Sequence, residues 1–290
     1  LNNVEMPRSS GYTTALRNIG SIRNSGFELQ LDGRIIDRAV KWDLGVNFSL
    51  NRSKVLVLSE DKDIFGGELD NTILKDQLNL MRVGEPMYVF YGYVEDGYDE
   101  NGHIVYKNMD DDPAITAADK TIIGDPNPDF LVNLTTAVSY KGFTLSAFFQ
   151  SSIGNDIYSL SMAAQAYDYG YNGNTLREVY YNHWTPENPT AKYPNLDQTS
   201  YKMSDRFVYD GSFVRLKNLE LAYDVPCARS KFIKRARVYV SAQNLFTITS
   251  YPFWDPDINA NGGGSSMIQG VDSYCYPSAR TYTIGCRLTF

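Results

Sequence analysis

The residues whose types and spacing could hold a metal ion lie in one acidic segment. Counted from Asn108, side chains that carry oxygen occupy the first, third, fifth, ninth and twelfth positions. These side chains belong to Asn108, Asp110, Asp112, Thr116 and Asp119. The spacing is typical of a calcium-binding loop, in which a tight turn brings such oxygens around one hard cation. Calcium is therefore a possible ligand, and no cofactor is required.

Two positions of this segment depart from the calcium-loop pattern. Pro113 stands where the loop needs glycine, and Pro cannot supply the backbone twist of that position. Asp119 is shorter than the glutamate that usually closes the loop with two oxygens. A solvated acidic loop is the alternative interpretation, and a calorimetric titration with calcium separates the two.

Aromatic side chains are concentrated in two long segments that contain no strand pattern. The set comprises Tyr167, Tyr169, Tyr171, Tyr180, Tyr181, Trp184, Phe253 and Trp254. Aromatic rings give a large contact area at low entropic cost, so they suit stacking on sugars or gripping a peptide. Contact with a partner protein is an equally good interpretation. Tyr elsewhere in the chain suits an interface rim or a membrane girdle.

A catalytic constellation is not evident. His103 and His183 stand outside any nucleophile-elbow motif, and Cys227, Cys275 and Cys286 form no metal-binding spacing. The carboxylates of Asp110 and Asp112 could in principle hydrolyse glycosides, but no pocket that raises a pKa is evident around them. We therefore expect the chain not to be an enzyme.

The composition excludes several classes of protein. The chain has 290 residues, of which 43% are hydrophobic and 13% aromatic, and its formal net charge is -7. An acidic chain without a basic surface is not expected to bind nucleic acid. No run of about 18 apolar residues is present, so a membrane-spanning helix is not expected.

The dominant pattern is alternation of apolar and polar residues, which predicts β-strands. It is clearest at the end of the chain, where Tyr282, Ile284, Cys286, Leu288 and Phe290 alternate with polar residues. The predicted strands are near 21–34, 41–51, 73–82, 86–94, 129–140, 143–153, 212–224, 236–248 and 280–290. The strand at 212–224 changes face around Asn218, as a β-bulge would cause.

The connections between these strands alternate between short and long. The segments 35–40, 83–86, 141–142 and 225–235 are short, and 52–72, 95–128, 154–211 and 249–279 are long. Short turns at one end and long loops at the other are typical of outer-membrane barrels. About nine strands would leave two open edges in lipid, so we expect part of a larger antiparallel barrel. A soluble β-sandwich module that binds carbohydrate is the alternative fold.

Several motifs along the chain resemble a known family. They are Asn18–Gly20, Asn24–Glu28, Gly84–Pro86, Tyr91–Tyr93, Gly124–Phe130, Trp184–Pro189, Val214–Leu219, Asn244–Thr247 and the stretch from Tyr276 to Phe290. In order and spacing, they resemble the C-terminal barrel region of SusC/RagA-like TonB-dependent outer-membrane transporters. These transporters are the nutrient importers of Bacteroidetes, which are Gram-negative.

The resemblance implies further properties. It implies a 22-stranded barrel, of which residues 1–290 are the C-terminal part, with the plug domain, the TonB box and the first strands upstream. It also implies a SusD-like surface lipoprotein as a lid, the TonB complex as the energy source, and oligosaccharide or peptide as cargo.

The same interpretation assigns two faces to each strand. The apolar face would contact outer-membrane lipid. The other face would line the lumen with Glu28, Gln30, Asp32, Arg34, Asn47, Gln150, Gln243 and Arg287, most of which would hold the plug and hydrate the wall.

Overall fold

The structure, a computed structural model, describes residues 2–17, 20–58, 62–70, 74–167, 174–227, 232–258 and 267–290. The described residues are mostly antiparallel β-strand, with two short α-helices, α1 (Leu160–Tyr167) and α2 (Arg177–Tyr181). Neither helix is long and apolar enough to cross a membrane, and no other described helix is either.

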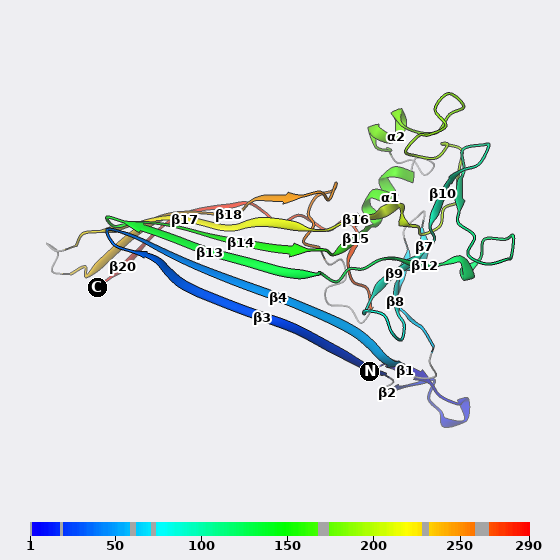
Figure 1. The fold of residues 1–290 in the computed structure, drawn as a ribbon, viewed down its shortest axis with the longest axis horizontal. Coiled ribbons are helices and arrows are strands. Elements are labelled where there is room, and N and C mark those ends of the chain that lie inside the picture. Colours follow the sequence, from blue (N-terminus) through cyan, green and yellow to red (C-terminus); the bar gives the residue numbers. More distant parts are fainter. Residues whose placement is uncertain are drawn as a thin grey trace.

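One large sheet dominates the fold (Figure 1). It contains β3 (Gly20–Asp37), β4 (Val40–Leu58), β13 (Phe130–Tyr140), β14 (Phe143–Ile153), β17 (Phe213–Val225), β18 (Arg235–Thr249) and β20 (Thr281–Thr289). Their order across the sheet is β20-β18-β17-β14-β13-β4-β3, and every neighbouring pair is antiparallel. The edge strands β3 and β20 each have one partner among the described residues.

The two ends of this sheet differ, as the sequence predicts. At one end the strands are joined by short turns, such as the two-residue turn Lys141-Gly142 between β13 and β14. Both residues have positive φ angles, 47° and 87°, which suits the right-handed twist of a two-residue hairpin and explains the glycine. At the other end, the long connections carry the helices and the smaller sheets (Figure 1).

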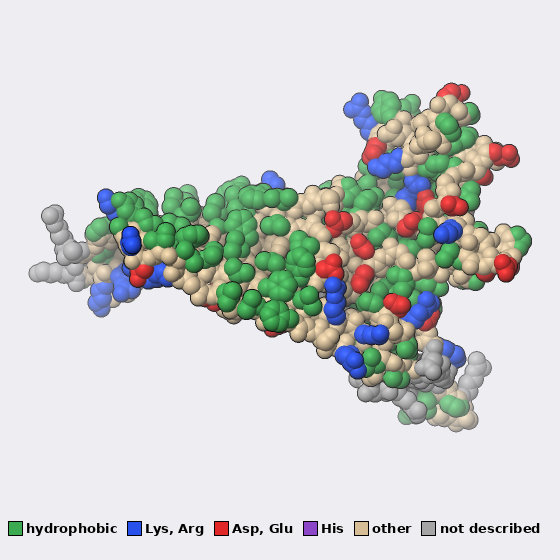
Figure 2. Space-filling view, in the orientation of Figure 1, with side chains coloured by type: hydrophobic (Ala, Val, Ile, Leu, Met, Phe, Trp, Pro, Cys, Tyr) green, Lys and Arg blue, Asp and Glu red, His purple; other side chains and the backbone are tan. Residues whose placement is uncertain are grey.

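The alternation of residues gives the sheet an apolar face and a polar face. One row on the apolar face runs in register across six strands through Leu31, Val46, Leu134, Phe149, Leu216 and Phe246. Many apolar side chains here are exposed, including Ile284, which is 87% exposed. Figure 2 shows hydrophobic side chains gathered over the strands. Among the described residues, no second large sheet covers this face as a β-sandwich would require.

The main buried core lies outside the large sheet, in an assembly of long connections that we call the loop head (residues 62–129, 154–212 and 250–280, where described). A small second cluster joins Val55 and Leu58 of β4 to Met81. The small sheets and helices of the loop head pack around a cluster that includes Leu78, Phe90, Tyr158, Val179 and Phe207. The strands of the loop head are β5 (Ile64–Phe65), β6 (Glu68–Asp70), β7 (Lys75–Gln77), β8 (Asn79–Met81), β9 (Val89–Gly92), β10 (Glu95–Tyr98), β11 (Ile104–Tyr106), β12 (Thr121–Gly124), β15 (Asp156–Ser159), β16 (Val208–Asp210) and β19 (Val271–Asp272).

Five further elements complete the described chain. A hairpin of β1 (Asn2–Glu5) and β2 (Thr14–Arg17) encloses the 3-10 helix η1 (Arg8–Ser10). Two more 3-10 helices, η3 (Ala117–Asp119) and η5 (Asp205–Phe207), lie in the loop head.

The prediction of nine strands in one sheet is wrong for two of them. The segments 73–82 and 86–94 contribute β8 and β9 to a four-stranded sheet, β12-β9-β8-β5, inside the loop head. The short connection at 83–86 therefore lies at the loop end, where Gly84 N donates to Val55 O. Residues 79–81 are all buried, so they belong to the packed core of the loop head. A barrel strand would instead expose every second residue to lipid.

The bulge predicted around Asn218 is confirmed. The register of β17 shifts between Leu216 and Asn218 against β18, and the same residues mark the shift against β14. The extra residue is Lys217, which returns the apolar side chains of β17 to one face of the sheet.

Candidate functional site

The polar face of the sheet carries a row of hydrogen-bonding side chains near the loop end. We call it the amide row. Gln30, Asn47, Asn133, Gln150, Arg215 and Thr247 are paired in register across β3, β4, β13, β14, β17 and β18. Gln30, Asn47 and Gln150 are three of the predicted lumen residues. The first four members are primary amides without charge, so their donors and acceptors define the character of this surface.

Three hollows lie along this face. One is lined by residues that include Gln30, Asn47 and Asn133. The second is lined by Asn133 and Gln150 together with Pro256 and Asp257 of the segment after β18. The third is lined by Arg215, Thr247 and Trp254 among others. Because Asn133 borders the first two hollows and the row continues into the third, the three hollows form one polar band.

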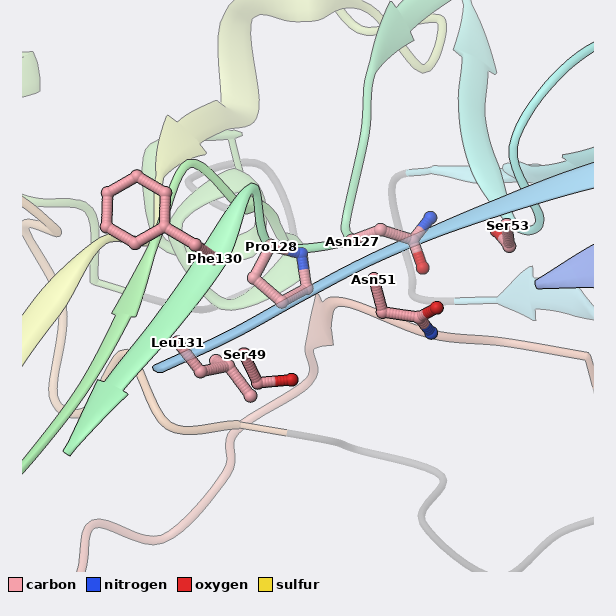
Figure 3. A pocket seen from close by; sticks show the side chains of 7 residues that line it. All are labelled: Ser49, Asn51, Ser53, Asn127, Pro128, Phe130 and Leu131. Carbon is pink, nitrogen blue, oxygen red and sulfur yellow. The ribbon is translucent and has the colours of Figure 1, made fainter. Parts of the chain in front are cut away.

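A fourth hollow lies at the rim, where β4 continues past the start of β13 (Figure 3). Ser49, Asn51 and Ser53 reach it from β4, and Asn127, Pro128, Phe130 and Leu131 come from the segment that enters β13. Asn127 is held in place, because its Nδ2 donates to Met87 O at 2.7 Å and to Asp125 Oδ1 at 2.7 Å. The rim therefore extends this face toward the loop head with uncharged side chains.

Arg215 fixes the segment after β18 against the polar face. Its side chain is only 2% exposed, and it pairs with Asp255 and, at 3.3 Å, with Asp257. Arg215 Nε also donates to Thr247 Oγ1 at 2.9 Å. Charge pairing within the chain thus neutralises Arg215. The motif around Arg215 was identified from the sequence, but this role was not, because Asp255 lies 40 positions away.

Asp255 stays negatively charged where the segment after β18 contacts Arg215 of β17. Burial favours a higher pKa, but backbone donation from Ser278 and Asp257, together with the Arg215 guanidinium, holds the pKa of Asp255 below its ordinary value. The carboxylate therefore stays charged at neutral pH and joins residues 255–257, residue 278 and β17 into one structure.

The predicted calcium loop is closed by hydrogen bonds of its own. Asn108 Oδ1, Asp110 Oδ1 and Asp112 Oδ1 each accept from a backbone N–H two residues later, at 3.1, 2.9 and 3.0 Å. Asp119 is buried and accepts from Met109 N and Thr116 N, both at 2.7 Å. These two bonds hold the pKa of Asp119 below its ordinary value.

The side-chain oxygens of this loop therefore already accept hydrogen bonds from backbone N–H groups. Thr116 caps the η3 helix and forms a capping box with Asp119. The described residues contain no group of three or more His, Cys, Asp or Glu side chains placed to hold a metal ion. Calcium binding stays a prediction for the calorimetric titration to decide.

The predicted aromatic residues of the 154–211 connection have unequal environments. Tyr167 is 4% exposed and stacks on Tyr201 with ring centroids 3.8 Å apart, so it belongs to the core of the loop head. Tyr180 and Tyr181 lie on α2 and are 61% and 65% exposed. Trp184 is half-buried and packs over Gly102. Tyr169 and Tyr171 lie outside the described residues.

The second predicted aromatic pair lies beside the polar face. Phe253 and Trp254 stack with ring centroids 4.6 Å apart and an interplanar angle of 21°. Trp254 is 55% exposed and lines the same hollow as Arg215 and Thr247. Of all the predicted aromatic residues, Trp254 is therefore the one that the described structure brings to the amide row.

The histidines have structural partners. His103 Nε2 lies 2.9 Å from Asp197 Oδ1, and His183 Nδ1 lies 2.8 Å from Tyr180 O. Among the described residues, neither ring is hydrogen-bonded to a serine or a cysteine.

This arrangement defines a class of structure. An antiparallel sheet with one exposed apolar face, one polar face, tight turns at one end and long loops at the other is the wall of an outer-membrane-type barrel. No protein-family model matches the chain.

Comparison with known proteins finds that the chain is similar to TonB-dependent receptors. It is 32% identical to the TonB-dependent receptor P3 of Formosa agariphila over 98% of this chain and 30% of that protein. It is 28% identical to the TonB-dependent receptor SusC of Bacteroides thetaiotaomicron over 100% of this chain and 29% of that protein. The solved structure of the RagAB peptide transporter superposes with a TM-score of 0.80 and 26% identity, over 99% of this chain and 31% of that chain.

Nearly the whole chain is thus homologous to part of a TonB-dependent receptor of the SusC and RagA type, which confirms the resemblance predicted from its motifs. The prediction of an antiparallel barrel fold is also confirmed. The chain spans about three tenths of the length of these relatives. The relatives are receptors and transporters, which agrees with the expectation that the chain is not an enzyme.

Proposed function

We propose that this chain forms the C-terminal part of the barrel of a nutrient importer in the outer membrane of a Gram-negative bacterium. Upstream regions would supply the plug, the TonB box and the remaining strands of a 22-stranded barrel. A SusD-like lipoprotein would close the outer opening, and oligosaccharides or peptides would be the cargo. The chain would perform no bond chemistry.

The proposal rests on one observation: apolar side chains are exposed in the large sheet and buried in the loop head. The sheet exposes its apolar face, whereas the loop head buries a core of its own. Exposed apolar side chains in such number are costly in water, but they suit contact with lipid hydrocarbon. The homology to TonB-dependent receptors and the similarity to the RagAB peptide importer support import as the direction of transport.

Cell fractionation and uptake measurements test the proposal together. We expect the complete receptor in the outer-membrane fraction, and we expect labelled cargo to enter cells only when TonB and the gene for the receptor are both intact. Recovery of the receptor from the aqueous fraction, or uptake that persists without TonB, would contradict the proposal.

A further inference from the structure

Three basic residues lie together on the apolar face of the large sheet, at its loop end. They are Arg23 of β3 and Arg52 and Lys54 of β4, all of them exposed. Arg23 pairs directly with Lys54 across the two strands, and Arg52 stands two residues before Lys54 on the same face of β4. Figure 2 shows Lys and Arg side chains gathered beside the loop end of the hydrophobic surface. We call these three residues the basic triplet.

The register of the strands places the basic triplet on the face that is turned toward lipid. The pairing of β3 with β4 continues from the triplet into the apolar band without a register shift, and in that band Phe27 pairs with Leu50. Side chains on one face of a strand recur at every second residue. Arg23 therefore shares the face of Phe27, and Arg52 and Lys54 share the face of Leu50.

Aromatic side chains mark the two edges of the apolar band. At the loop end, ring centroids are 6.3 Å apart for Phe27 and Phe48 and 5.8 Å apart for Phe48 and Phe130. At the turn end, Tyr140 lies ten residues beyond Phe130 on β13. Ten residues span about 34 Å of strand, or about 26 Å along the membrane normal at a tilt of about 40°. This height matches the apolar band of about 25 Å in outer-membrane barrels, so the row of Phe side chains marks its outer edge.

The basic triplet lies just beyond this outer edge. Arg52 and Lys54 follow Leu50, the partner of Phe27, by two and four residues. These steps correspond to about 5 and 10 Å along the membrane normal at the same tilt. The polar headgroups add about 5–8 Å to each side of the hydrocarbon, so the triplet lies at the level of the headgroups.

We propose that the basic triplet binds the phosphate groups of lipopolysaccharide, on its lipid A part. This inference rests on the proposed function, because it takes the loop end of the sheet as the outer side of an outer membrane. Lipopolysaccharide is the main lipid of the outer leaflet, and its lipid A part carries phosphate esters at the level of the headgroups. The ligand is therefore a lipid that surrounds the barrel, and not the cargo.

The arrangement of the charges favours an anion with several oxygens. Arg23 and Lys54 lie directly opposite each other, and like charges in that position repel, so a phosphate between them would remove a cost. Arg52 Nη2 pairs with Asp129 Oδ1 at 2.7 Å, and both side chains are about half exposed, at 54% and 52%. This pair orients the guanidinium and leaves its other N–H groups for a phosphate. Clusters of Lys and Arg at the edge of a membrane are typical of sites for anionic lipid headgroups.

Native mass spectrometry of the purified complete receptor in a mild detergent tests this inference. The probes are lipid A with its phosphates, lipid A from which the phosphates have been removed, and phosphatidylglycerol. We expect phosphorylated lipid A to bind most tightly. The Arg23→Gln/Lys54→Gln variant should weaken that binding about tenfold or more, because it removes two charge-assisted contacts. Arg23→Lys keeps the charge and should retain most of the affinity.

Arg38→Gln/Lys141→Gln is the matched control, because it also removes two exposed cations, but from the turn end of the sheet. We expect it to leave the affinity for lipid A unchanged. Equal losses in the two double variants would overturn the inference, since they would show a general attraction between charges. Binding that is as tight to dephosphorylated lipid A or to phosphatidylglycerol, or no binding of lipid A at all, would overturn it in the unmodified receptor, whether or not the variants fold.

The inference and the proposed function can fail separately. A receptor that reaches the outer membrane and imports cargo through TonB, but binds lipid A without any preference for its phosphates, would reject the inference alone. Recovery of the receptor from the aqueous fraction would reject the proposed function itself.

Discussion

The large sheet and the loop head use apolar residues in opposite ways. In the loop head, side chains such as Leu78 and Phe90 are fully buried and pack around a common core. In the sheet, side chains of the same kinds, such as Leu145 and Phe143, remain about half exposed. The loop head therefore folds by the rules of a water-soluble protein, whereas the sheet has a face that needs lipid to cover it.

The boundary between the two regions therefore follows the solvent that surrounds each of them, and not the order of residues along the chain. The segments of the loop head are interleaved with the strands of the sheet along the chain, yet they gather at one end of the molecule (Figure 1). The two regions meet at Arg215, where a strand of the sheet is tied to Asp255 of a long connection.

The largest expected effect comes from breaking that junction. Arg215→Ala leaves the buried carboxylate of Asp255 without its cation, and we expect a loss of about 3–5 kcal/mol in the free energy of unfolding. Denaturant unfolding of the receptor in lipid vesicles measures it. The control is Arg215→Met/Asp255→Asn, which removes both charges and should cost less. Equal losses would show that the ion pair does not join the two regions.

A pair of matched truncations compares the two regions directly. Leu80→Ala opens a cavity in the loop head and should cost about 2–5 kcal/mol, because the surrounding core cannot fully collapse. Leu145→Ala removes the same atoms from the exposed face of β14, where lipid chains can fill the space, so it should cost clearly less. The same unfolding assay measures both variants. A larger cost at Leu145 would refute the assignment of the loop head to water and of the apolar sheet face to lipid.

Charge substitution on β20 tests the two faces of the sheet. Ile284→Arg places a cation on the apolar face and should cost about 2–4 kcal/mol if the residue lies near the middle of the membrane. Thr283→Arg places it on the polar face and should cost much less. Refolding into vesicles, monitored by electrophoretic mobility, provides the measurement. Equal costs would contradict the assigned faces.

The smallest expected effect is local and depends on pH. The pKa of Asp119 lies below its ordinary value of 3.8 because the folded loop donates hydrogen bonds to its carboxylate. The stabilisation is therefore complete above about pH 4 and is lost as the pH falls through the folded-state pKa. The protection factors for hydrogen exchange at Met109 and Thr116, which are corrected for the intrinsic pH dependence of exchange, should fall there, and Asp119→Asn should remove that fall. Protection that is independent of pH in the unmodified receptor would contradict this.

The sequence predicted the parts of the fold that follow from local pattern. Alternation predicted β13, β14, β18 and β20, and a change of face at Asn218 predicted the bulge in β17. The Lys141-Gly142 turn was also evident, since the strands around it alternate without interruption. Each of these features depends on residues within one or two strands, so the periodicity carries the information.

The predictions that were wrong concern features that depend on contacts between residues far apart in the sequence. The segments near 80 and 90 have strand-like sequences, but burial in the loop head, and not alternation, determines where they pair. Tyr167 was predicted to contact cargo or lid, and its burial beside Tyr201 follows from a fold that no local pattern encodes. The amide row was only partly recognised, because Asn133 and Arg215 join it through strand register.

The orientation of β20 decides whether the apolar face of the large sheet contacts lipid. Single tryptophans placed in turn at residues 281–289 of the complete receptor, in a background lacking the native tryptophans, can be quenched by brominated lipid chains. We predict strong quenching at the even-numbered positions, including Tyr282, Ile284 and Leu288, and weak quenching at the odd-numbered positions. Uniform quenching along the strand, or quenching that is stronger at the odd-numbered positions, would contradict the account.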